Sequence, residues 1–165
     1  QLGQWRLFSL NSNLGPLQHA AQLAWLRDEL ARQGARCTLA YWHHPLYSSG
    51  MHGNIARMKD VWQVLYEAGA ELVLAGHDHI YERFAPQDAE GRRDDARGIR
   101  QFVAGTGGAF ATPVMWPRPN SETSDANRYG VLRLVLGADG YAWEFLDAAV
   151  DGAGLRLDRG AARCH

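Results

Sequence analysis

The sequence predicts an α/β fold, in which short apolar strands alternate with amphipathic helices. Residues 36–42 (RCTLAYW) and 70–76 (AELVLAG) are short apolar runs of the kind that form buried strands. Leucines recur at helical spacing within residues 17–33, and apolar residues repeat that pattern at 55–65. This order of strands and helices is typical of α/β proteins.

The flanking segments add further expected elements. Trp5, Leu7 and Ser9 alternate within residues 4–13 and predict a strand with these three side chains on one face. Two alternating runs around the turn GADG predict a β-hairpin over residues 130–147. The other expected elements are a strand within 99–108, loops at 86–98 and 111–127, an edge strand within 148–157, and Asn54 as a helix N-cap.

Length and composition restrict the class of protein. A chain of 165 residues with 46% hydrophobic residues suits one domain with a sizeable core. Its net charge of -1 gives no electrostatic reason to expect nucleic acid as a partner. No apolar run approaches the roughly 20 residues that a membrane span needs.

The chain has two cysteines, Cys37 and Cys164. One disulfide between them would indicate an oxidising compartment, and two unpaired thiols are the alternative. Neither cysteine belongs to a CxxC or CxxH unit, so a metal site made from this pair is not expected.

Histidines gather where two predicted strands end. Five of the seven lie between His43 and His79, and neutral imidazole is a common ligand for transition metals. In an extended segment His77 and His79 point to the same side, so they could bind one metal or two neighbouring metals. Asp78 would point away and could orient a histidine or support a turn. His44 has an open role, because adjacent residues of a strand face opposite ways.

Other polar and aromatic residues have simpler interpretations. His19 lies on a predicted helix surface, and His165 is the last residue of the chain. Tyr47 and Trp116 are interpreted as packing residues, with a place at a substrate entrance as the alternative.

The two histidine segments carry a resemblance to a known family. LAGHDHIYER at 74–83, preceded by AYWHHPLYSSG at 40–50, resembles the C-terminal half of a calcineurin-like metallophosphoesterase of the purple-acid-phosphatase-like branch. TGG at 106–108 fits the same pattern, and the resemblance runs from about residue 7 to residue 147. It implies that residues 1–165 form a single partial domain, the C-terminal half of the αββα sandwich of that family.

The resemblance also implies a phosphoric-ester hydrolase that binds two transition-metal ions, either two divalent ions or an iron–divalent pair of Fe, Zn or Mn. His43 and His77 would bind one ion and His79 the other. His52 would be the catalytic histidine beside the phosphate of a small phosphoester, binding it or protonating the leaving group. His44 and Tyr47 are the other candidate substrate-binding residues, and the YER segment at 81–83 is expected to be structural.

The sequence also departs from the family pattern. It contains no GD and no GNH motif, which supply the aspartate and asparagine ligands in the family and would lie before Gln1. We therefore expect the chain to be the second half of an enzyme, with the N-terminal half as a possible partner and little activity alone. A non-catalytic metal-binding or interaction module is the alternative, and a structural zinc site of His43, His77 and His79 is a weaker one. Similarity to exported relatives and the cysteine pair favour a secreted or periplasmic location.

Overall fold

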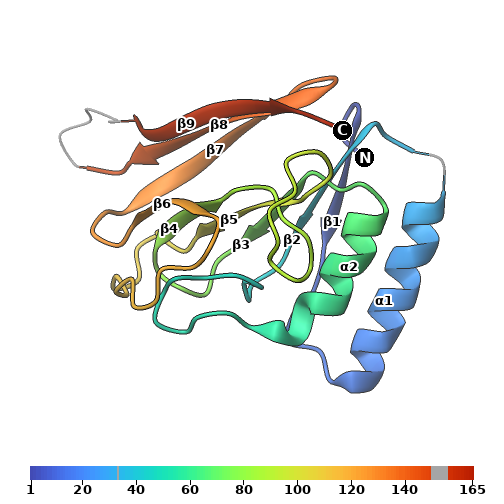
Figure 1. Ribbon diagram of the computed structural model, residues 1–165, viewed down its shortest axis with the longest axis horizontal. Helices are drawn as coiled ribbons and strands as arrows, with labels where there is room; N and C mark the ends of the chain where they lie inside the picture. The colour runs from blue at the N-terminus through green and yellow to red at the C-terminus, as the bar shows by residue number, and fades with distance from the viewer. Residues whose placement is uncertain (33, 150–155) are drawn as a thin grey trace.

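The computed structural model describes residues 1–32, 34–149 and 156–165 as three layers: helices, a mixed sheet and a smaller sheet (Figure 1). The predicted α/β class is confirmed. The elements are β1 (Trp5–Ser9), α1 (Pro16–Ala31), β2 (Cys37–Tyr41), the 3-10 helix η1 (Ala56–Met58), α2 (Lys59–Glu67), β3 (Leu72–Ala75), β4 (Tyr81–Phe84), β5 (Arg100–Ala104), β6 (Ser121–Asp125), β7 (Gly130–Leu136), β8 (Gly140–Asp147) and β9 (Arg156–Arg163).

The larger sheet has the strand order β1-β2-β3-β5-β4-β6. Strands β1, β2, β3 and β5 are parallel, and β4 runs antiparallel to both of its neighbours. Leu39 of β2 pairs with Leu72 of β3, which in turn pairs with Arg100 of β5. The carboxyl ends of the parallel strands therefore lie at one edge, where loops can place side chains from several strands together.

Helices α1 and α2 cover one face of this sheet (Figure 1). Trp62 and Leu65 of α2 are fully buried, because they lie on the apolar stripe that the helix turns toward the sheet. Leu26 of α1 is fully buried in the same cluster. Burial of such side chains contributes about 1.5–3 kcal/mol each and fixes the helical layer on the sheet.

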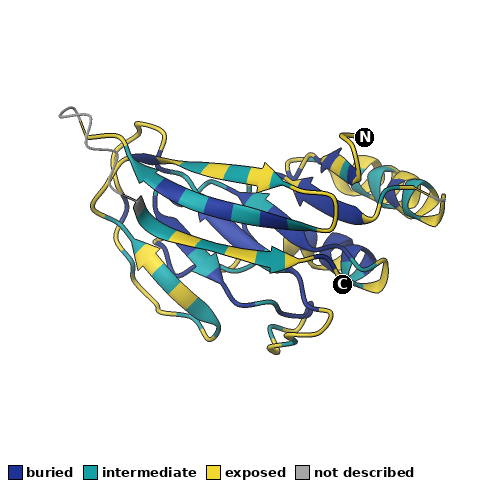
Figure 2. Cartoon of the chain, turned by 90° about the horizontal axis from the view of Figure 1, so that it is seen from above, coloured by how far each residue is buried: buried dark blue, intermediate teal, exposed yellow. Residues whose placement is uncertain are grey.

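The three-stranded sheet β7-β8-β9 covers the opposite face. Buried and half-buried residues alternate along β8, whereas β7 and β9 also carry exposed residues (Figure 2). Between the sheets, the rings of Tyr81 and Phe145 stack with centroids 4.0 Å apart. Asp158 of β9 accepts hydrogen bonds from the Tyr81 hydroxyl at 2.6 Å and from Arg83 Nε at 2.7 Å. The YER segment is therefore structural, as expected.

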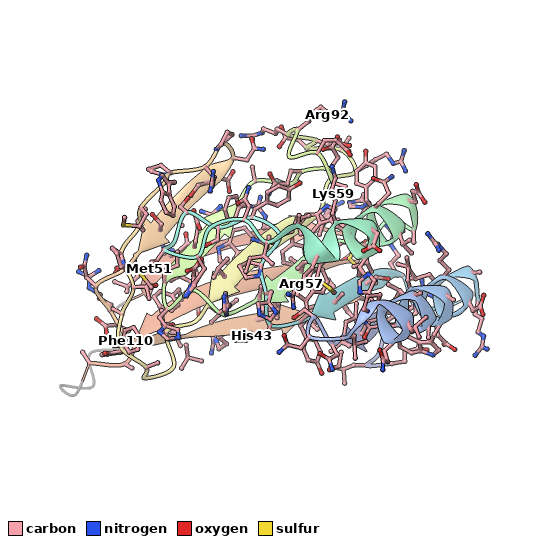
Figure 3. The ribbon with its side chains drawn as sticks, turned by 90° about the horizontal axis from the view of Figure 1, so that it is seen from below. His43, Met51, Arg57, Lys59, Arg92 and Phe110 are labelled. Carbon is pink, nitrogen blue, oxygen red and sulfur yellow. A yellow bond between two sulfur atoms is a disulfide. The ribbon has the colours of Figure 1, made fainter. Side chains whose placement is uncertain are left out.

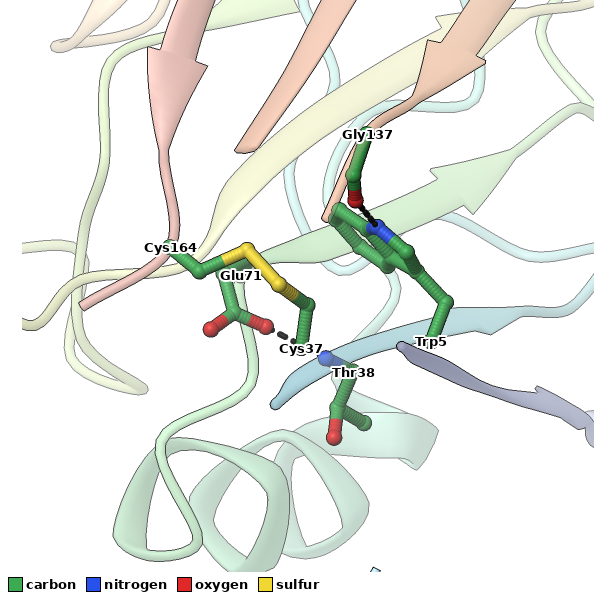
Figure 4. Close-up of a disulfide and its surroundings, with 6 residues drawn as sticks. All are labelled: Trp5, Cys37, Thr38, Glu71, Gly137 and Cys164. Atoms are coloured by element: carbon green, nitrogen blue, oxygen red, sulfur yellow. Dashed lines mark hydrogen bonds between the residues drawn. A yellow bond between two sulfur atoms is a disulfide. The ribbon is translucent and has the colours of Figure 1, made fainter. Parts of the chain in front are cut away.

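A disulfide joins the two sheets (Figure 4). Cys37 of β2 and Cys164, which follows β9, are bonded with their Cα atoms 5.8 Å apart. Nearby, Trp5 Nε1 donates a 2.8 Å hydrogen bond to the Gly137 carbonyl of the β7–β8 turn. The C-terminal sheet is thus attached covalently to the second strand of the larger sheet, and the alternative of two unpaired thiols is excluded.

Several elements differ from expectation. Ser121–Asp125 forms the strand β6 inside a segment that the sequence predicts to be a loop. Its sequence has no apolar pattern, and it becomes a strand because its backbone pairs with β4. Asn54 is not an N-cap, since η1 precedes α2 and the Asn54 Oδ1 atom accepts the Ser48 N–H at 2.8 Å. Trp5 and Phe8 are buried in separate clusters on opposite faces of β1, whereas Leu7 of this edge strand is exposed. The edge strand expected at 148–157 falls largely on residues 150–155, outside the described residues, and β9 begins at Arg156.

Within the described residues, no helix has the length and apolar character that crossing a membrane requires.

We expect the Cys37→Ala/Cys164→Ala double variant to lose up to about 5 kcal/mol of unfolding free energy. The two cysteines are 127 residues apart in the sequence, and a closed loop of that size strongly restricts the unfolded chain. Urea denaturation of both proteins measures the difference. Two reactive thiols in denatured, unreduced wild-type protein would contradict the disulfide.

Glu71 beside the disulfide predicts a pH-dependent stability. Its side chain is buried, Oε2 accepts the Thr38 N–H at 2.5 Å, and Oε1 has no hydrogen-bond partner among the described residues (Figure 4). Burial raises the pKa of Glu71 from 4.5 to about 7. The folded protein then holds more protons than the unfolded chain between these values, so stability falls as the pH rises from 4.5 to 7.

Glu71→Gln removes this titration. We expect the variant to gain stability relative to wild type between pH 5 and pH 8, by up to about 3 kcal/mol. Urea denaturation at both pH values measures the gain, and Glu67→Gln, at an exposed position of α2, is the control. An unchanged difference between the two pH values would show that Glu71 titrates normally.

Candidate metal centre

The centre is built where β2 and β3 end. Past the strands, the backbones remain paired, because Trp42 N–H donates to Leu74 O at 3.1 Å and Gly76 N–H donates to His43 O at 3.0 Å. His77 then adopts a φ of 65°, in the left-handed region that non-glycine residues enter at a cost of about 1 kcal/mol or more. This bend turns its ring toward His43.

Three imidazoles meet at this point. Nδ1 of His77 lies 3.1 Å from Nε2 of His43, and the ligand atoms of His43, His44 and His77 all lie within 4.8 Å of one another. The sequence leaves the role of His44 open; the structure places its ring beside His43 and His77, because β2 ends at Tyr41 and strand alternation no longer applies. Sequence reasoning missed Ser12, whose Oγ lies 2.8 Å from His44 Nδ1. Its position after β1, at the same edge of the sheet, was the available signal.

Burial and the neighbouring rings lower the pKa values of His44 and His77. Burial, followed by the nearby His77 and His43, lowers the pKa of His44 to about 4. Burial, followed by His52 and His43, also lowers the pKa of His77. Near pH 7 both rings therefore carry lone pairs, which is the state that binds a metal.

The donor set fits a transition-metal ion. Two nitrogens bound to one tetrahedral zinc are expected about 3.3 Å apart, close to the 3.1 Å between His43 and His77. Imidazole suits zinc and iron. Among the described residues, however, no carboxylate belongs to this cluster. The cluster therefore has ligands for one ion but no group that could bridge two.

Asp78 connects the second histidine segment to the first. Its carboxylate is fully buried and accepts hydrogen bonds from the Ser48 hydroxyl, from His52 N at 2.9 Å, and from His52 Nδ1 at 2.7 Å. A Cβ atom at Gly50 would overlap this carboxylate, so glycine is required there. The His52 ring is exposed, and its centroid is 4.3 Å from that of His77. Asp78 thus orients His52, with Nδ1 turned inward.

His79 stands apart from the three clustered rings. Its Nδ1 lies 2.7 Å from the Phe110 carbonyl, and its N–H donates to Thr112 Oγ1 at 3.0 Å. A carbonyl can only accept, so Nδ1 carries the proton and Nε2 carries the lone pair. This tautomer leaves Nε2 able to bind a second ion.

The remaining candidates lie elsewhere. Tyr47 donates a 2.9 Å hydrogen bond to Asp88 O and packs against Trp62 and Phe84. Burial raises its pKa, so it stays neutral, and it belongs to the core rather than to the histidine group. His19 Nε2 lies 2.8 Å from Asp60 Oδ2, within hydrogen-bond distance, on the helical layer.

A second group of potential ligands is Cys37, Cys164 and Glu71, which also lie within 4.8 Å of one another. Both sulfurs are consumed by the disulfide, so they are not thiolate donors.

The chain is similar in sequence to known phosphoesterases and acid phosphatases. Residues 2–81 match the family described as calcineurin-like phosphoesterase. Purple acid phosphatase 21 of Arabidopsis thaliana is 25% identical over 163 residues, which cover 89% of this chain and 37% of that protein. An acid phosphatase of Aspergillus ficuum is 28% identical over 92 residues, covering 53% of this chain and 15% of that protein.

Solved structures share the fold. The purple acid phosphatase PPD1 from yellow lupin seeds superposes with a TM-score of 0.83 at 17% identity, covering 98% of this chain and 31% of that one. GAP50, described as the anchor in the inner membrane complex of Plasmodium, has a TM-score of 0.79 at 16% identity and covers 98% and 50%. The chain therefore spans about a third of the length of the first of these relatives in each comparison.

We expect the chain to bind zinc through the clustered imidazoles. His43→Ala or His77→Ala should weaken zinc binding more than about tenfold, the loss that even an indirect partner of a metal ligand can cause. Competition against a chromogenic chelator at pH 7 measures the affinity. His19→Ala is the matched control, and equal effects of all three variants would contradict the assignment.

Proposed function

Because the chain belongs to the calcineurin-like metallophosphoesterase family and is purple-acid-phosphatase-like within it, we propose that it forms the histidine-bearing part of a dinuclear phosphoric-ester hydrolase. The observation that carries this proposal is the meeting of His43, His44 and His77 at the carboxyl ends of parallel strands. Such strand ends hold side chains rigidly at the mouth of a crevice. The proposed location is secreted or periplasmic, in keeping with the disulfide.

The proposed ligands divide between two ions. His43 and His77 would hold one ion through the two nitrogens that lie 3.1 Å apart. His79 would bind the other through Nε2, since its Nδ1 faces the Phe110 carbonyl. Two bound ions would supply a hydroxide near neutral pH and positive charge at the phosphoryl oxygens.

His52 has the geometry of a proton donor. A ring held by Asp78 at Nδ1 presents Nε2 away from the protein, toward an approaching substrate. The Asp78 carboxylate accepts the Nδ1 hydrogen bond and fixes the orientation of the ring. A proton carried at Nε2 would then be directed at a phosphoryl oxygen or at the departing alkoxide.

Within residues 1–32, 34–149 and 156–165, the proposed ligand set is incomplete. A centre with two imidazoles on one ion and one on the other, without a bridging carboxylate, would hold its metals weakly. We propose that carboxylate and amide ligands come from chain elements outside residues 1–165. The proposed hydrolase would then be active only when those elements are present.

The absence of a carboxylate from the described cluster also supports a second candidate, a non-catalytic metal-binding or interaction module. GAP50 shares the fold and is described as an anchor, so the fold by itself does not imply catalysis. At 16% sequence identity, the similarity to GAP50 shows a shared fold and no shared function.

Hydrolysis of 4-nitrophenyl phosphate tests the two candidates. We expect residues 1–165 with zinc, iron or manganese to show little turnover, and the full product of the gene to be active. In the active protein, His79→Ala should abolish turnover and His52→Ala should lower kcat about 100-fold or more, because it removes a positioned acid. His19→Ala should have no effect.

A metal-loaded full gene product without phosphoesterase activity would favour the module. Rapid turnover by residues 1–165 alone, with two metal equivalents bound, would overturn the proposal that the ligand set is incomplete.

A further inference from the structure

Four large apolar side chains are exposed on two loops, one that contains His52 and one that contacts His79. Met51 is 42% exposed, Phe110 72%, Met115 48% and Trp116 50%. Met51 belongs to the loop of residues 48–53, which contains His52. The other three belong to residues 110–118, a segment that we call the apolar strap. Large apolar side chains gathered at the surface commonly mark a binding site.

One end of the apolar strap is attached to His79. The Phe110 carbonyl lies 2.7 Å from His79 Nδ1, and the backbone of Thr112 donates to His79 O at 3.3 Å. The Phe110 and His79 rings meet edge to face, with centroids 5.2 Å apart. Phe110 is therefore in direct contact with a proposed metal ligand.

The other end is attached to the loop that carries His52. Met115 N–H and Trp116 N–H both donate to Ser49 O, at 2.8 and 3.2 Å, and Arg118 Nε donates to Ser48 O at 3.1 Å. Ser48 also binds the Asp78 carboxylate that orients His52. The strap and the proposed proton donor thus share one rigid support.

The Trp116 ring lies near Gly53, the residue that follows His52 in the sequence. A Cβ atom built on Gly53 would be 3.9 Å from the Trp116 ring and 3.1 Å from Arg118 Nη2. In Figure 3, Met51 and Phe110 lie at the end of the molecule away from the helices, with His43 nearer its middle. The apolar side chains therefore border the histidine group on the side of His52 and His79.

The chemistry of the strap suits an aromatic group carried by an anion. Phe and Trp offer flat apolar faces, and methionine adapts to irregular aromatic shapes. Among the described residues, Arg118 forms no ion pair, so its charge remains available to favour an anionic ligand. The group that departs from a phosphoester lies on the side of the proton donor, which here is His52.

We propose that Phe110, Trp116, Met51 and Met115 form a leaving-group subsite selecting phosphoesters of aromatic alcohols. The subsite rests on the proposed hydrolase function, because its occupant is defined by the position of His52 and the metal ligands. Phe110 and Trp116 are specificity-determining residues in this proposal.

Binding of non-hydrolysable phosphonates tests the subsite without requiring turnover. We expect the zinc-loaded full product of the gene, in which the proposed ligand set is complete, to bind phenylphosphonate about tenfold more tightly than methylphosphonate, as one stacked aromatic contact can provide. The Phe110→Leu/Trp116→Leu double variant should lose this preference and keep its affinity for methylphosphonate. Trp25→Leu, at a 47% exposed tryptophan of α1, is the matched control. Isothermal titration calorimetry measures the affinities, and circular dichroism verifies that each variant is folded.

Each result decides between the proposals. Equal affinity for the two phosphonates in wild type, or a preference that survives in the double variant, overturns the subsite. Phenylphosphonate binding that depends on the strap, without measurable methylphosphonate binding, supports the subsite and counts against the metal–phosphoryl centre. Failure of both ligands to bind overturns both proposals. Self-association that the double variant abolishes, with no phosphonate preference in wild type, assigns the surface to a second copy of the chain.

Discussion

The buried carboxylate of Asp78 is the interaction on which the candidate centre depends. It lies between two histidines of the second segment and accepts hydrogen bonds from Ser48 and His52 of the first. A fully buried carboxylate destabilises the fold unless hydrogen-bond donors surround it. Moving any one of these donors away would leave a buried oxygen without a partner, so the donors are held in place. Gly50 and Gly105 are glycines because a side chain at either position would overlap Asp78. One anion therefore sets the positions of the loops around it.

The three layers give this anion a rigid foundation. The parallel pairing of β2 with β3 continues to His43 and Gly76, which brings His43 beside His77, and helices α1 and α2 bury one face of those strands. The small sheet buries the other face and is attached through the disulfide and through Asp158. At the ends of these strands, burial, followed by the charges of the neighbouring rings, lowers the pKa values of His44 and His77.

The crowding has a chemical meaning that the individual residues lack. In the proposed function, the His43 and His77 nitrogens that lie 3.1 Å apart bind one ion together, and His79, whose Nδ1 faces the Phe110 carbonyl, binds a second. The apolar strap contacts His79 and is hydrogen-bonded to the loop that contains His52. The proposed chemistry and the proposed selectivity therefore depend on the same loops. The chain spans about a third of the length of the first relatives in each comparison. Among the described residues, the cluster of His43, His44 and His77 contains nitrogen ligands and no carboxylate.

The amino-acid sequence by itself determined the α/β class, the hairpin of β7 and β8, and the gathering of histidines after two strands. These features follow from local periodicity and from motifs, which are properties of neighbouring residues. Only the tertiary structure decided that His44 joins His43 and His77, that Tyr47 belongs to the core, and that Asn54 binds Ser48 instead of capping a helix. It also decided the pairing of β6 with β4 and of Cys37 with Cys164. The physical reason is common to all of them: each depends on contacts between segments far apart in the chain, which local patterns do not encode.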